Sequence, residues 1–533
     1  MVWSVSGNES AGGGLMQAAS PAYNPYGDSV FSNMRVSFRL VDTTAYADAS
    51  PSVSESEPGL TQLDQLHDLV DGMSAKWATF ETQGWRADGS YSLIPDDLTS
   101  HQTGWWSNLS GENGSFASPP TLTFEFTADH SPIGFTVIFD DRAGRHPLSM
   151  TVYAYDAAET LIDAQTVVVT SARQVVDMPV ENYRKLVIEF GDTQLPYQRV
   201  RVAEVIFGIV QYFDRSNIRS GEMIYEISPT AEFLPSTELE LVFDNNDGKY
   251  NMGNPEGVYE YLQQGQPMDT EIGVGPSAED IEYVTMGRVF YSVSAAEDDS
   301  MTASIVAHDP FFTLDQSTCR IGTTGTWTLS EAAAAIAADS GLDIVINLPA
   351  ELGSRIIKKS LPAVSHREAF RLAAQAAKCT CFFNRANELQ FVEFSPGSPA
   401  AEVNEDNMEK PAKPKDLGRI NKIELIVKDE FAGTESLYAA SNILPGETAR
   451  VKPISNPLAH DGEDVSAWLL SMYQNRITYD TIDPGNPALE VLDTITVTDN
   501  YGIDHDVVIL RQHFMFDGTL SADMTSLQPR EVV

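Results

Sequence analysis

The sequence contains little of what marks several large classes of protein. It has three cysteines in 533 residues, Cys319, Cys379 and Cys381, so a disulfide framework is excluded. The spacing Cys379-x-Cys381 fits neither a zinc site nor a redox CxxC motif, and we expect both residues on one face of a strand. No apolar run approaches the roughly 18 residues that a membrane-spanning helix needs, which argues against stable membrane insertion.

Basic residues are also scarce. The chain has 34 Lys and Arg residues against 76 Asp and Glu residues, for a formal net charge of −42. A surface this acidic repels phosphate, which excludes nucleic-acid binding through a general basic face. The first twenty residues, MVWSVSGNESAGGGLMQAAS, lack the basic start and apolar centre of a secretory signal. We therefore expect a protein that is made in the cytoplasm and works as part of an assembly.

Catalytic motifs are missing as well. The sequence has no HExxH, GxSxG or P-loop pattern, so we expect no enzyme activity, no catalytic residue, no metal and no cofactor. His366 falls in the first turn of a predicted helix, and we expect it to be exposed there rather than to be a ligand. The pair Asp140-Asp141 could serve a glycosidase only across a cleft, and turn residues are the favoured interpretation.

The stretch Asp244-Asn-Asn-Asp247-Gly248 invites comparison with a calcium loop. An EF-hand places glycine at position six and glutamate at position twelve. Counted from Asp244, glycine falls at position five and Pro255 at position twelve, so the motif fails. We expect a turn that uses Asn and Gly for left-handed backbone angles.

What is present is a strong strand pattern between about residues 77 and 210. Apolar and polar residues alternate with a period of two in several short segments, and Asp-, Gly- and Asn-rich turns separate them. This spacing is typical of an antiparallel sandwich or jelly roll. The alternating apolar residues are Leu122, Phe124, Phe126, Phe135, Val137, Phe139, Val152, Ala154, Leu186, Ile188 and Phe190.

Large aromatic residues gather at the start of this stretch. Sugar-binding jelly rolls stack Trp and Tyr rings on pyranose faces, so Trp85 and Trp105 are candidate ligand-binding residues. The alternative is that these rings fill the ends of a small sandwich, because they bring the most apolar area to a core. The core interpretation is favoured, and both remain open from the sequence.

Different patterns flank the sandwich. A strand is expected at MRVSFRLVD before it, a short helix at TQLDQLHDLVDG, and a barrel-type sheet from about residue 211 to 315. Residues 316–400 change to an α/β pattern, with capping boxes at Thr328–Glu331 and Ser365–Glu368 that open two helices. Residues 401–414 have the proline and charge content of a linker. A second β-region with one helix, near EDVSAWLLSMYQNR, follows from 415 to 533.

Several blocks follow one another along the chain: RVSFRLVD, LVFDNNDGKYN, GRVFYSVSAAEDDSMTASIVAHDPF, SHREAFRLAAQAAKCTCFFNRANELQF and HFMFDGTL. In this order they resemble the tail hub or baseplate hub proteins of bacteriophages, namely the tail-tip proteins of phages and prophages of Gram-positive bacteria and of related phage-tail-like particles. The resemblance extends from about residue 33 to the end. Residues 77–208 resemble a discoidin-like (galactose-binding-like) jelly roll, which that family often carries as an insertion.

The resemblance implies a mainly β fold with a small α/β part: two tube-like β-barrel domains, an inserted antiparallel jelly-roll sandwich and a small α/β domain. The expected segments are an N-terminal arm (1–30), the first part of a hub barrel (31–76), the jelly roll (77–210), the rest of that barrel (211–315), the α/β domain (316–400), the linker (401–414) and a second hub barrel (415–533). Relatives often continue into fibres or a wall-cleaving enzyme, and we expect that activity to be absent here.

The resemblance also implies a function. The chain would be a structural hub at the tip of the virion tail, where a homotrimer with six-fold pseudosymmetry closes the tail tube and meets the tube, distal tail, tip or fibre proteins. DNA would be only passing cargo, and an acidic lumen would let it slide. The alternative is a receptor-binding tail protein whose jelly roll holds host cell-wall carbohydrate through Trp85 or Trp105.

Overall fold

The computed structural model describes residues 24–27, 30–57, 59–68, 73, 77–82, 84–85, 91–92, 101–140, 146–254, 257–278, 280–295 and 301–529. These residues divide into two compact units. The smaller unit takes residues 38–211 and 255–266, and the larger unit takes residues 212–254, residues from 267 onward and the residues before 38. The chain passes between the units inside β1 (Phe31–Val41) and β11 (Gly208–Phe213), and again before and after residues 255–266. The expected N-terminal arm lies almost entirely outside the described residues.

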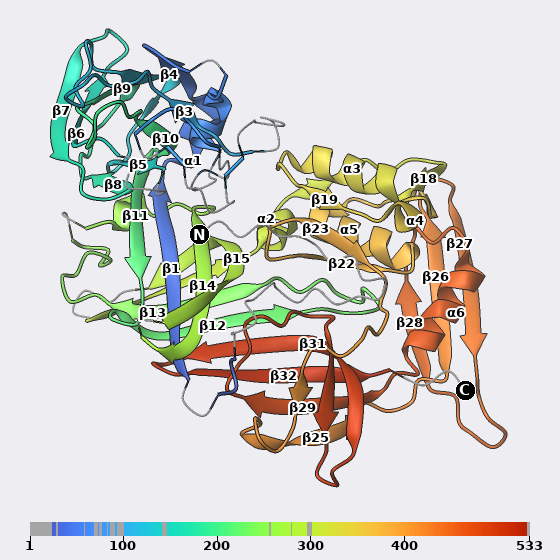
Figure 1. Cartoon of the computed structure of the whole chain (residues 1–533). Helices are drawn as coiled ribbons and strands as arrows, with labels where there is room; N and C mark the ends of the chain where they lie inside the picture. The colour runs from blue at the N-terminus through green and yellow to red at the C-terminus, as the bar shows by residue number, and fades with distance from the viewer. Residues whose placement is uncertain are drawn as a thin grey trace. The chain divides into compact units, whose positions relative to one another are not determined.

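The smaller unit is a sandwich of two antiparallel sheets (Figure 1). One sheet has the order β2-β4-β9-β6-β7, formed by Ser50–Val53, Thr121–His130, Tyr183–Phe190, Ser149–Tyr155 and Leu161–Val168. The other has the order β3-β10-β5-β8, formed by Trp105–Trp106, Arg201–Ile206, Phe135–Phe139 and Arg173–Val176.

The predicted alternation forms the core of this sandwich. Leu122 and Phe124 on β4, and Leu186 and Ile188 on β9, are fully buried in one cluster with residues of the opposite sheet. Strand residues between them face outward, as a period of two requires. Each such side chain contributes about 1.5–3 kcal/mol when it leaves water, so the pattern that identifies the strands also stabilises their packing.

The sandwich unit begins earlier in the sequence than the boundary expected at residue 77. Helix α1 (Thr43–Asp48), β2 and the 3₁₀ helix η1 (Leu63–His67) all belong to it. The buried His130 ring holds α1 in place, because its Nδ1 lies 2.9 Å from Asp42 Oδ2 and its Nε2 lies 3.0 Å from Asp48 Oδ2. Hydrogen bonds from Thr127, Ala128 and His130 keep the pKa of Asp48 well below its usual value.

The larger unit is built on one long sheet. From β1 onward its order is β14-β15-β16-β13-β12-β31-β32-β29-β25. Strand β30 also pairs with β31, and β24 pairs with β30. Strands from both expected barrels therefore join one sheet, through antiparallel pairing of β12 with β31. Their bounds are Pro267–Ser277, Asp280–Ala295, Thr302–His308, Glu238–Asp244, Ile218–Glu226, Asp504–Phe516, Leu520–Gln528, Ile477–Asp483, Lys410–Asp416, Glu402–Val403 and Thr494–Thr498.

The α/β part packs around two helices as predicted. Helix α3 (Leu329–Ser340) begins with a complete capping box between Thr328 and Glu331 and ends at Gly341, whose φ is 71°. Helix α5 (His366–Ala376) is capped by Ser365, whose side chain accepts a hydrogen bond from the Glu368 N–H. The remaining elements are α2 (Pro310–Asp315), β17 (Thr318–Cys319), β18 (Thr326–Thr328), β19 (Ile346–Asn347), α4 (Ala350–Gly353), β20 (Ile356–Lys358), β21 (Val364–Ser365) and the expected hairpin of β22 (Thr380–Phe383) and β23 (Leu389–Val392).

The last β-region does not fold as one piece. Strands β26 (Lys422–Asp429), β27 (Thr434–Ser441) and β28 (Val451–Ser455) form a separate three-stranded sheet, which α6 (Gly462–Met472) covers. The expected linker at 401–414 is corrected as well, because it contains β24 and most of β25. Its prolines fit this position, since β25 is an edge strand and leaves one side of its backbone unpaired.

Two short helices complete the described elements. The helix expected at TQLDQLHDLVDG is the single 3₁₀ turn η1, and its expected last residues lie outside the described part of the chain. The other is η2 (Tyr259–Tyr261). Across the described ranges, each helix is too short or too polar to cross a bilayer.

Candidate functional site

Three loops of the sandwich unit join into one layer. They comprise residues 78–85, 107–111 and 195–199. The backbone N–H of Thr82 donates to the Tyr197 carbonyl at 3.2 Å, and the N–H of Tyr197 donates to the Gly111 carbonyl at 3.3 Å. The N–H of Ser110 donates to the Gln198 carbonyl at 2.9 Å. Backbone hydrogen bonds therefore hold segments together that are more than eighty residues apart in the sequence.

This loop layer exposes large apolar side chains. Phe80 is fully exposed, Trp85 is 54% exposed, Tyr197 is 49% exposed and Leu109 is 42% exposed. Exposed aromatic rings on a rigid layer can stack on a sugar face or bury a partner's apolar side chain. We call these four residues the aromatic loop surface.

Trp105 does not belong to the aromatic loop surface. It is 0% exposed, packs against Phe190 with ring centroids 5.3 Å apart, and donates from Nε1 to the Glu55 carbonyl at 2.9 Å. A ring enclosed on both faces cannot stack on a ligand. Trp105 is therefore a core residue and not the ligand-binding residue that it was a candidate for. Its position on β3, at the inner face of the sandwich, is the physical reason.

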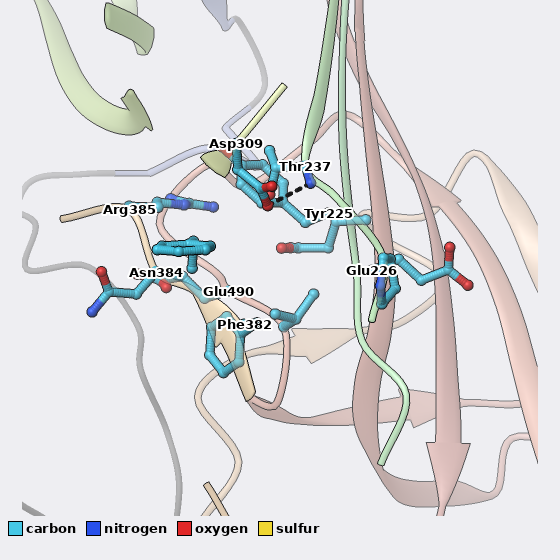
Figure 2. Close-up of a pocket in the computed structure, with 12 residues that line it drawn as sticks. Tyr225, Glu226, Thr237, Asp309, Phe382, Asn384, Arg385 and Glu490 are labelled. Carbon is cyan, nitrogen blue, oxygen red and sulfur yellow. Dashed lines mark hydrogen bonds between the residues drawn. The ribbon is translucent and has the colours of Figure 1, made fainter. Parts of the chain in front are cut away.

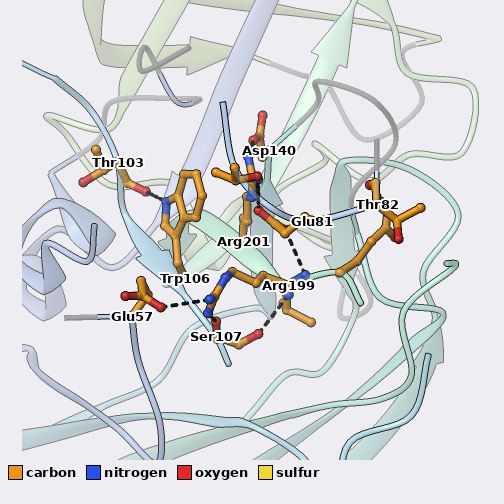
Figure 3. A network of polar contacts seen from close by, with 12 residues as sticks. Glu57, Glu81, Thr82, Thr103, Trp106, Ser107, Asp140, Arg199 and Arg201 are labelled. Carbon is orange, nitrogen blue, oxygen red and sulfur yellow. Dashed lines mark hydrogen bonds and ion pairs between the residues drawn. The ribbon is translucent and has the colours of Figure 1, made fainter. Parts of the chain in front are cut away.

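A buried charge network lies beneath the loops (Figure 3). The Arg201 guanidinium forms ion pairs with Glu81 and, at 2.9 Å, with Asp140, and it lies 3.7 Å from the centre of the Trp106 ring. Glu81 and Asp140 are nearly inaccessible to solvent, and so is Arg201. A buried arginine needs such partners, because an unpaired buried charge costs several kcal/mol.

Glu81 connects this network to the first loop. One of its carboxylate oxygens accepts a hydrogen bond from Thr79 Oγ1 at 2.7 Å, and the other accepts from the Arg199 backbone N–H at 3.0 Å. The Arg199 side chain forms an ion pair with Glu57 at 2.8 Å. The charges therefore position the loops that carry Phe80, Trp85 and Tyr197, rather than forming a reactive centre.

Asp140 differs from its expected role as a turn residue. It is completely buried at the end of β5 and pairs with Arg201, while Asp141 lies outside the described residues. The turn at Asp244–Gly248 is confirmed. Gly248 has φ of 66°, and its N–H donates to the Asn245 carbonyl at 3.0 Å. Gly248 alone supplies the left-handed angle there, whereas Asn245 is buried and orders the turn through its side chain.

The larger unit has a small pocket of about 10 Å³, close to the size of one water molecule (Figure 2). Arg385 crosses it, donating to the Leu489 carbonyl at 2.8 Å and lying 5.1 Å from the centre of the Tyr225 ring. Burial raises the pKa of Asp309 to about 6, although this carboxylate accepts hydrogen bonds from Thr237 and from the start of α2. The side chains around this pocket are packed together, and the pocket is too small to hold a substrate.

The three cysteines and His366 all lie in the α/β part. Cys379 and Cys381 are buried in one cluster, but only Cys381 lies on a strand, because β22 begins at Thr380, after Cys379. His366 contradicts its expected exposure, because it is 2% exposed. Ser317 and Asp339 hold its ring from both sides, at 2.7 Å from Nδ1 and 3.1 Å from Nε2. A first-turn position alone did not predict these contacts, which come from residues 49 and 27 positions away.

Sequence patterns missed Phe80, Leu109 and Tyr197 as site candidates. None of them falls in an alternating strand pattern, and this pattern was the signal that identified structure in this part of the sequence. Tyr197 also has φ of 54°, an uncommon backbone angle outside glycine that marks a specially shaped loop.

No family model matches the chain, and no curated protein matches it. Solved structures do. The chain is similar to a tail protein from Neisseria meningitidis MC58, with 13% identity over 60% of this chain and 94% of the other and a TM-score of 0.43. It is similar to a 43 kDa tail protein of prophage MuSo2 from Shewanella oneidensis, with 14% identity, the same coverages and a TM-score of 0.42.

The chain is also similar to a family 32 carbohydrate-binding module from C. perfringens, solved in complex with galactose. Identity is 13%, the TM-score is 0.21, and the coverage is 33% of this chain and 99% of the module. The structural neighbours of this mostly β chain are thus phage tail proteins and carbohydrate-binding modules. At these identities and TM-scores the matches assign neither a role nor an activity to this chain.

Proposed function

We propose that this chain is the structural hub of a phage tail or phage-tail-like particle, and that three copies form a ring that closes the tail tube and anchors the tip or baseplate. The role is structural and not enzymatic. The hub lies at the virion tail tip, where it meets tube or distal tail proteins on one side and tip or fibre proteins on the other.

The observation that carries this proposal is the pairing of β12 with β31. Gly221 lies opposite Phe516 and Glu226 lies opposite Arg511, so two groups of strands that are far apart in the sequence share a continuous sheet. A subunit with two such groups side by side supplies two segments of a tube wall. Three subunits would then complete a wall of six segments, which is the symmetry expected of a tail tube.

Charge supports the same arrangement. Three copies would carry 3 × (−42) = −126 formal charges. If part of this charge lines the lumen, DNA slides through without the attraction to phosphate that would stall it. A ring whose lumen is rich in Lys and Arg would contradict this part of the proposal.

One edge of the long sheet is suited to contact a second copy of the chain. We call it the lysine edge, and it consists of Lys410, Lys413 and Lys415 on β25. All three lysines are exposed on an edge strand, and no carboxylate among the described residues forms an ion pair with them. A positive edge on so acidic a chain favours an acidic surface of a second copy. Lys413→Glu with Lys415→Glu should weaken the trimer, whereas Lys428→Glu on β26 should leave it intact.

Native mass spectrometry of the full chain tests the trimer. One chain has a mass of 58.4 kDa, so we expect a species of about 175 kDa. A monomer that persists at micromolar concentration would contradict the hub proposal.

A second function is favoured by the aromatic loop surface. We infer that this surface binds host cell-wall carbohydrate, with the Trp85 and Tyr197 rings stacking on sugar faces. Their exposure beside the buried Glu81–Arg201 network supports a rigid platform.

Co-sedimentation of the full chain with purified cell walls tests this second function. Trp85→Ala and Tyr197→Ala should each reduce binding about tenfold, since stacking contacts of this kind contribute on the order of 1 kcal/mol or more. Tyr501→Ala is the matched control, because Tyr501 is 87% exposed in the other unit. No binding by the native chain, or equal loss in all three variants, would end this proposal without affecting the hub.

A further inference from the structure

Three side chains that commonly bind metals meet in the α/β part of the larger unit. Cys319 ends β17, Asp339 lies in the last turn of α3, and His366 begins α5. The Cys319 sulfur, a carboxylate oxygen of Asp339 and a ring nitrogen of His366 all lie within 4.8 Å of one another. Ligands of a tetrahedral Zn²⁺ lie about 3.3–3.8 Å apart, since zinc bonds measure about 2.0–2.3 Å. A closure of about 1 Å would therefore bring all three onto one ion.

Burial separates this group from an ordinary surface cluster. Cys319 is 0% exposed and His366 is 2% exposed, while the Asp339 side chain is 34% exposed. Two ligands are thus fixed inside the core, and the third lies at the surface. An ion and its water ligand would therefore reach the site from the Asp339 side.

Neighbouring groups orient the two buried ligands. Ser317 Oγ lies 2.7 Å from His366 Nδ1, and Asp339 Oδ2 lies 3.1 Å from Nε2. When Nδ1–H donates to Ser317, the lone pair of Nε2 points to the side where Asp339 lies. Histidines bound to metals usually donate their other ring N–H to an oxygen in this way. Burial raises the pKa of the Cys319 thiol to about 11, although the backbone N–H of Ile321 donates to the sulfur, so an ion would have to displace a firmly held proton.

We propose that Cys319, Asp339 and His366 form a Zn²⁺ site with water as the fourth ligand. Sulfur, imidazole and carboxylate are the three ligand types that zinc takes in proteins. The ion would replace the proton of the Cys319 thiol, which is released to solvent, and would bind the neutral imidazole. It would join β17, the end of α3 and the start of α5, so its effect is to stabilise the α/β part.

Metal binding to the full chain tests the site. The protein is first freed of metal with a chelator and dialysed, then titrated with Zn²⁺ by calorimetry and with Co²⁺ by absorption spectroscopy. We expect one equivalent of either ion, a thiolate-to-cobalt charge-transfer band, and a rise in the thermal unfolding midpoint on addition of Zn²⁺. Absence of stoichiometric binding by the native chain would overturn the proposal.

Variants identify the ligands. Cys319→Ser should remove the charge-transfer band and weaken Zn²⁺ binding at least 100-fold, whereas Cys379→Ser, at a buried cysteine in the same core, should change neither. Asp339→Asn keeps the shape of a partly exposed side chain, so it tests the site even if Cys319→Ser fails to fold. Ser317→Ala should weaken binding about tenfold through the histidine. Equal affinity in the native chain and Asp339→Asn would also overturn the proposal.

Discussion

At the scale of single residues, buried carboxylates differ in how many ion pairs and hydrogen bonds they receive. Glu81 and Asp140 both form ion pairs with the Arg201 guanidinium, and Glu81 also accepts hydrogen bonds from Thr79 Oγ1 and the Arg199 N–H. Asp483 at the end of β29 accepts one hydrogen bond from the Gly485 N–H at 2.6 Å, and no described residue donates to its second oxygen. Burial therefore raises the pKa of Asp483 to about 7, and the nearby Glu409 acts in the same direction.

Asp483 should make stability fall as the pH rises. Its pKa is higher in the folded state than the 3.8 of a free side chain, so folding favours the protonated form. The stabilisation is complete below pH 4 and is lost as the pH passes through about 7, by on the order of 2–3 kcal/mol between pH 5 and pH 8. Asp483→Asn removes this loss, so the variant should exceed the native chain in thermal unfolding midpoint at pH 8 much more than at pH 5.

Asp343→Asn is the control for Asp483, because Asp343 is exposed after the end of α3. It should have the same unfolding midpoint as the native chain at both pH values. An Asp483→Asn variant that gains nothing at pH 8 would show that the carboxylate is solvated.

Glu81 should be the residue on which the loop layer depends most. Glu81→Ala removes one of the two partners of Arg201 and the acceptor for the Arg199 N–H. We expect a loss of about 3 kcal/mol in stability of the sandwich unit, since breaking a buried ion pair costs this much. Limited proteolysis should show faster cleavage between residues 78 and 85. Glu112→Ala, at an exposed position in the neighbouring loop, should be cleaved at the native rate.

At the scale of elements, the two capped helices show how far a local sequence motif determines the hydrogen bonds at the start of a helix. Both sequences match a capping box, and both caps accept a hydrogen bond from the residue three positions on. In α3 the Glu331 carboxylate also accepts from the Thr328 N–H at 2.9 Å. In α5 the Glu368 carboxylate pairs with Arg371 at 2.6 Å, so only half of the box forms.

A double-mutant cycle on each helix should distinguish the two caps. Thr328→Ala and Ser365→Ala should each cost about 1 kcal/mol. Thr328→Ala combined with Glu331→Ala should couple by about 0.5 kcal/mol, because each side chain orders the other. Ser365→Ala combined with Glu368→Ala should be additive. Coupling of equal size in both helices, measured from thermal unfolding, would contradict this difference.

Elements that depend on near neighbours were predictable from the sequence. Strands β4, β5 and β9 follow from alternation, and α3 and α5 follow from their caps, because these signals act within a few residues. The pairing of β12 with β31 could not be predicted, since almost 300 residues separate the partners. The burial of His366 was decided by contacts 49 and 27 residues away, which no local period contains. The sequence favoured a core position for Trp105 but could not name its partner Phe190.

At the scale of the whole molecule, the inserted sandwich and the long sheet have different roles in the two proposed functions. The sandwich unit presents an aromatic loop surface that suits recognition. The larger unit supplies the sheet, the lysine edge and most of the length. The expected boundary at residue 77 is not supported, because residues 42–57 and η1 group with the sandwich, while the other expected boundaries remain predictions.

Electron cryomicroscopy of the purified full-length chain tests the hub proposal most directly. We expect rings of three subunits with an open centre, in which the long sheet faces the lumen, acidic side chains line it and the sandwich lies on the outside. Particles of one or two subunits, or a ring with the sandwich facing the lumen, would contradict the hub proposal.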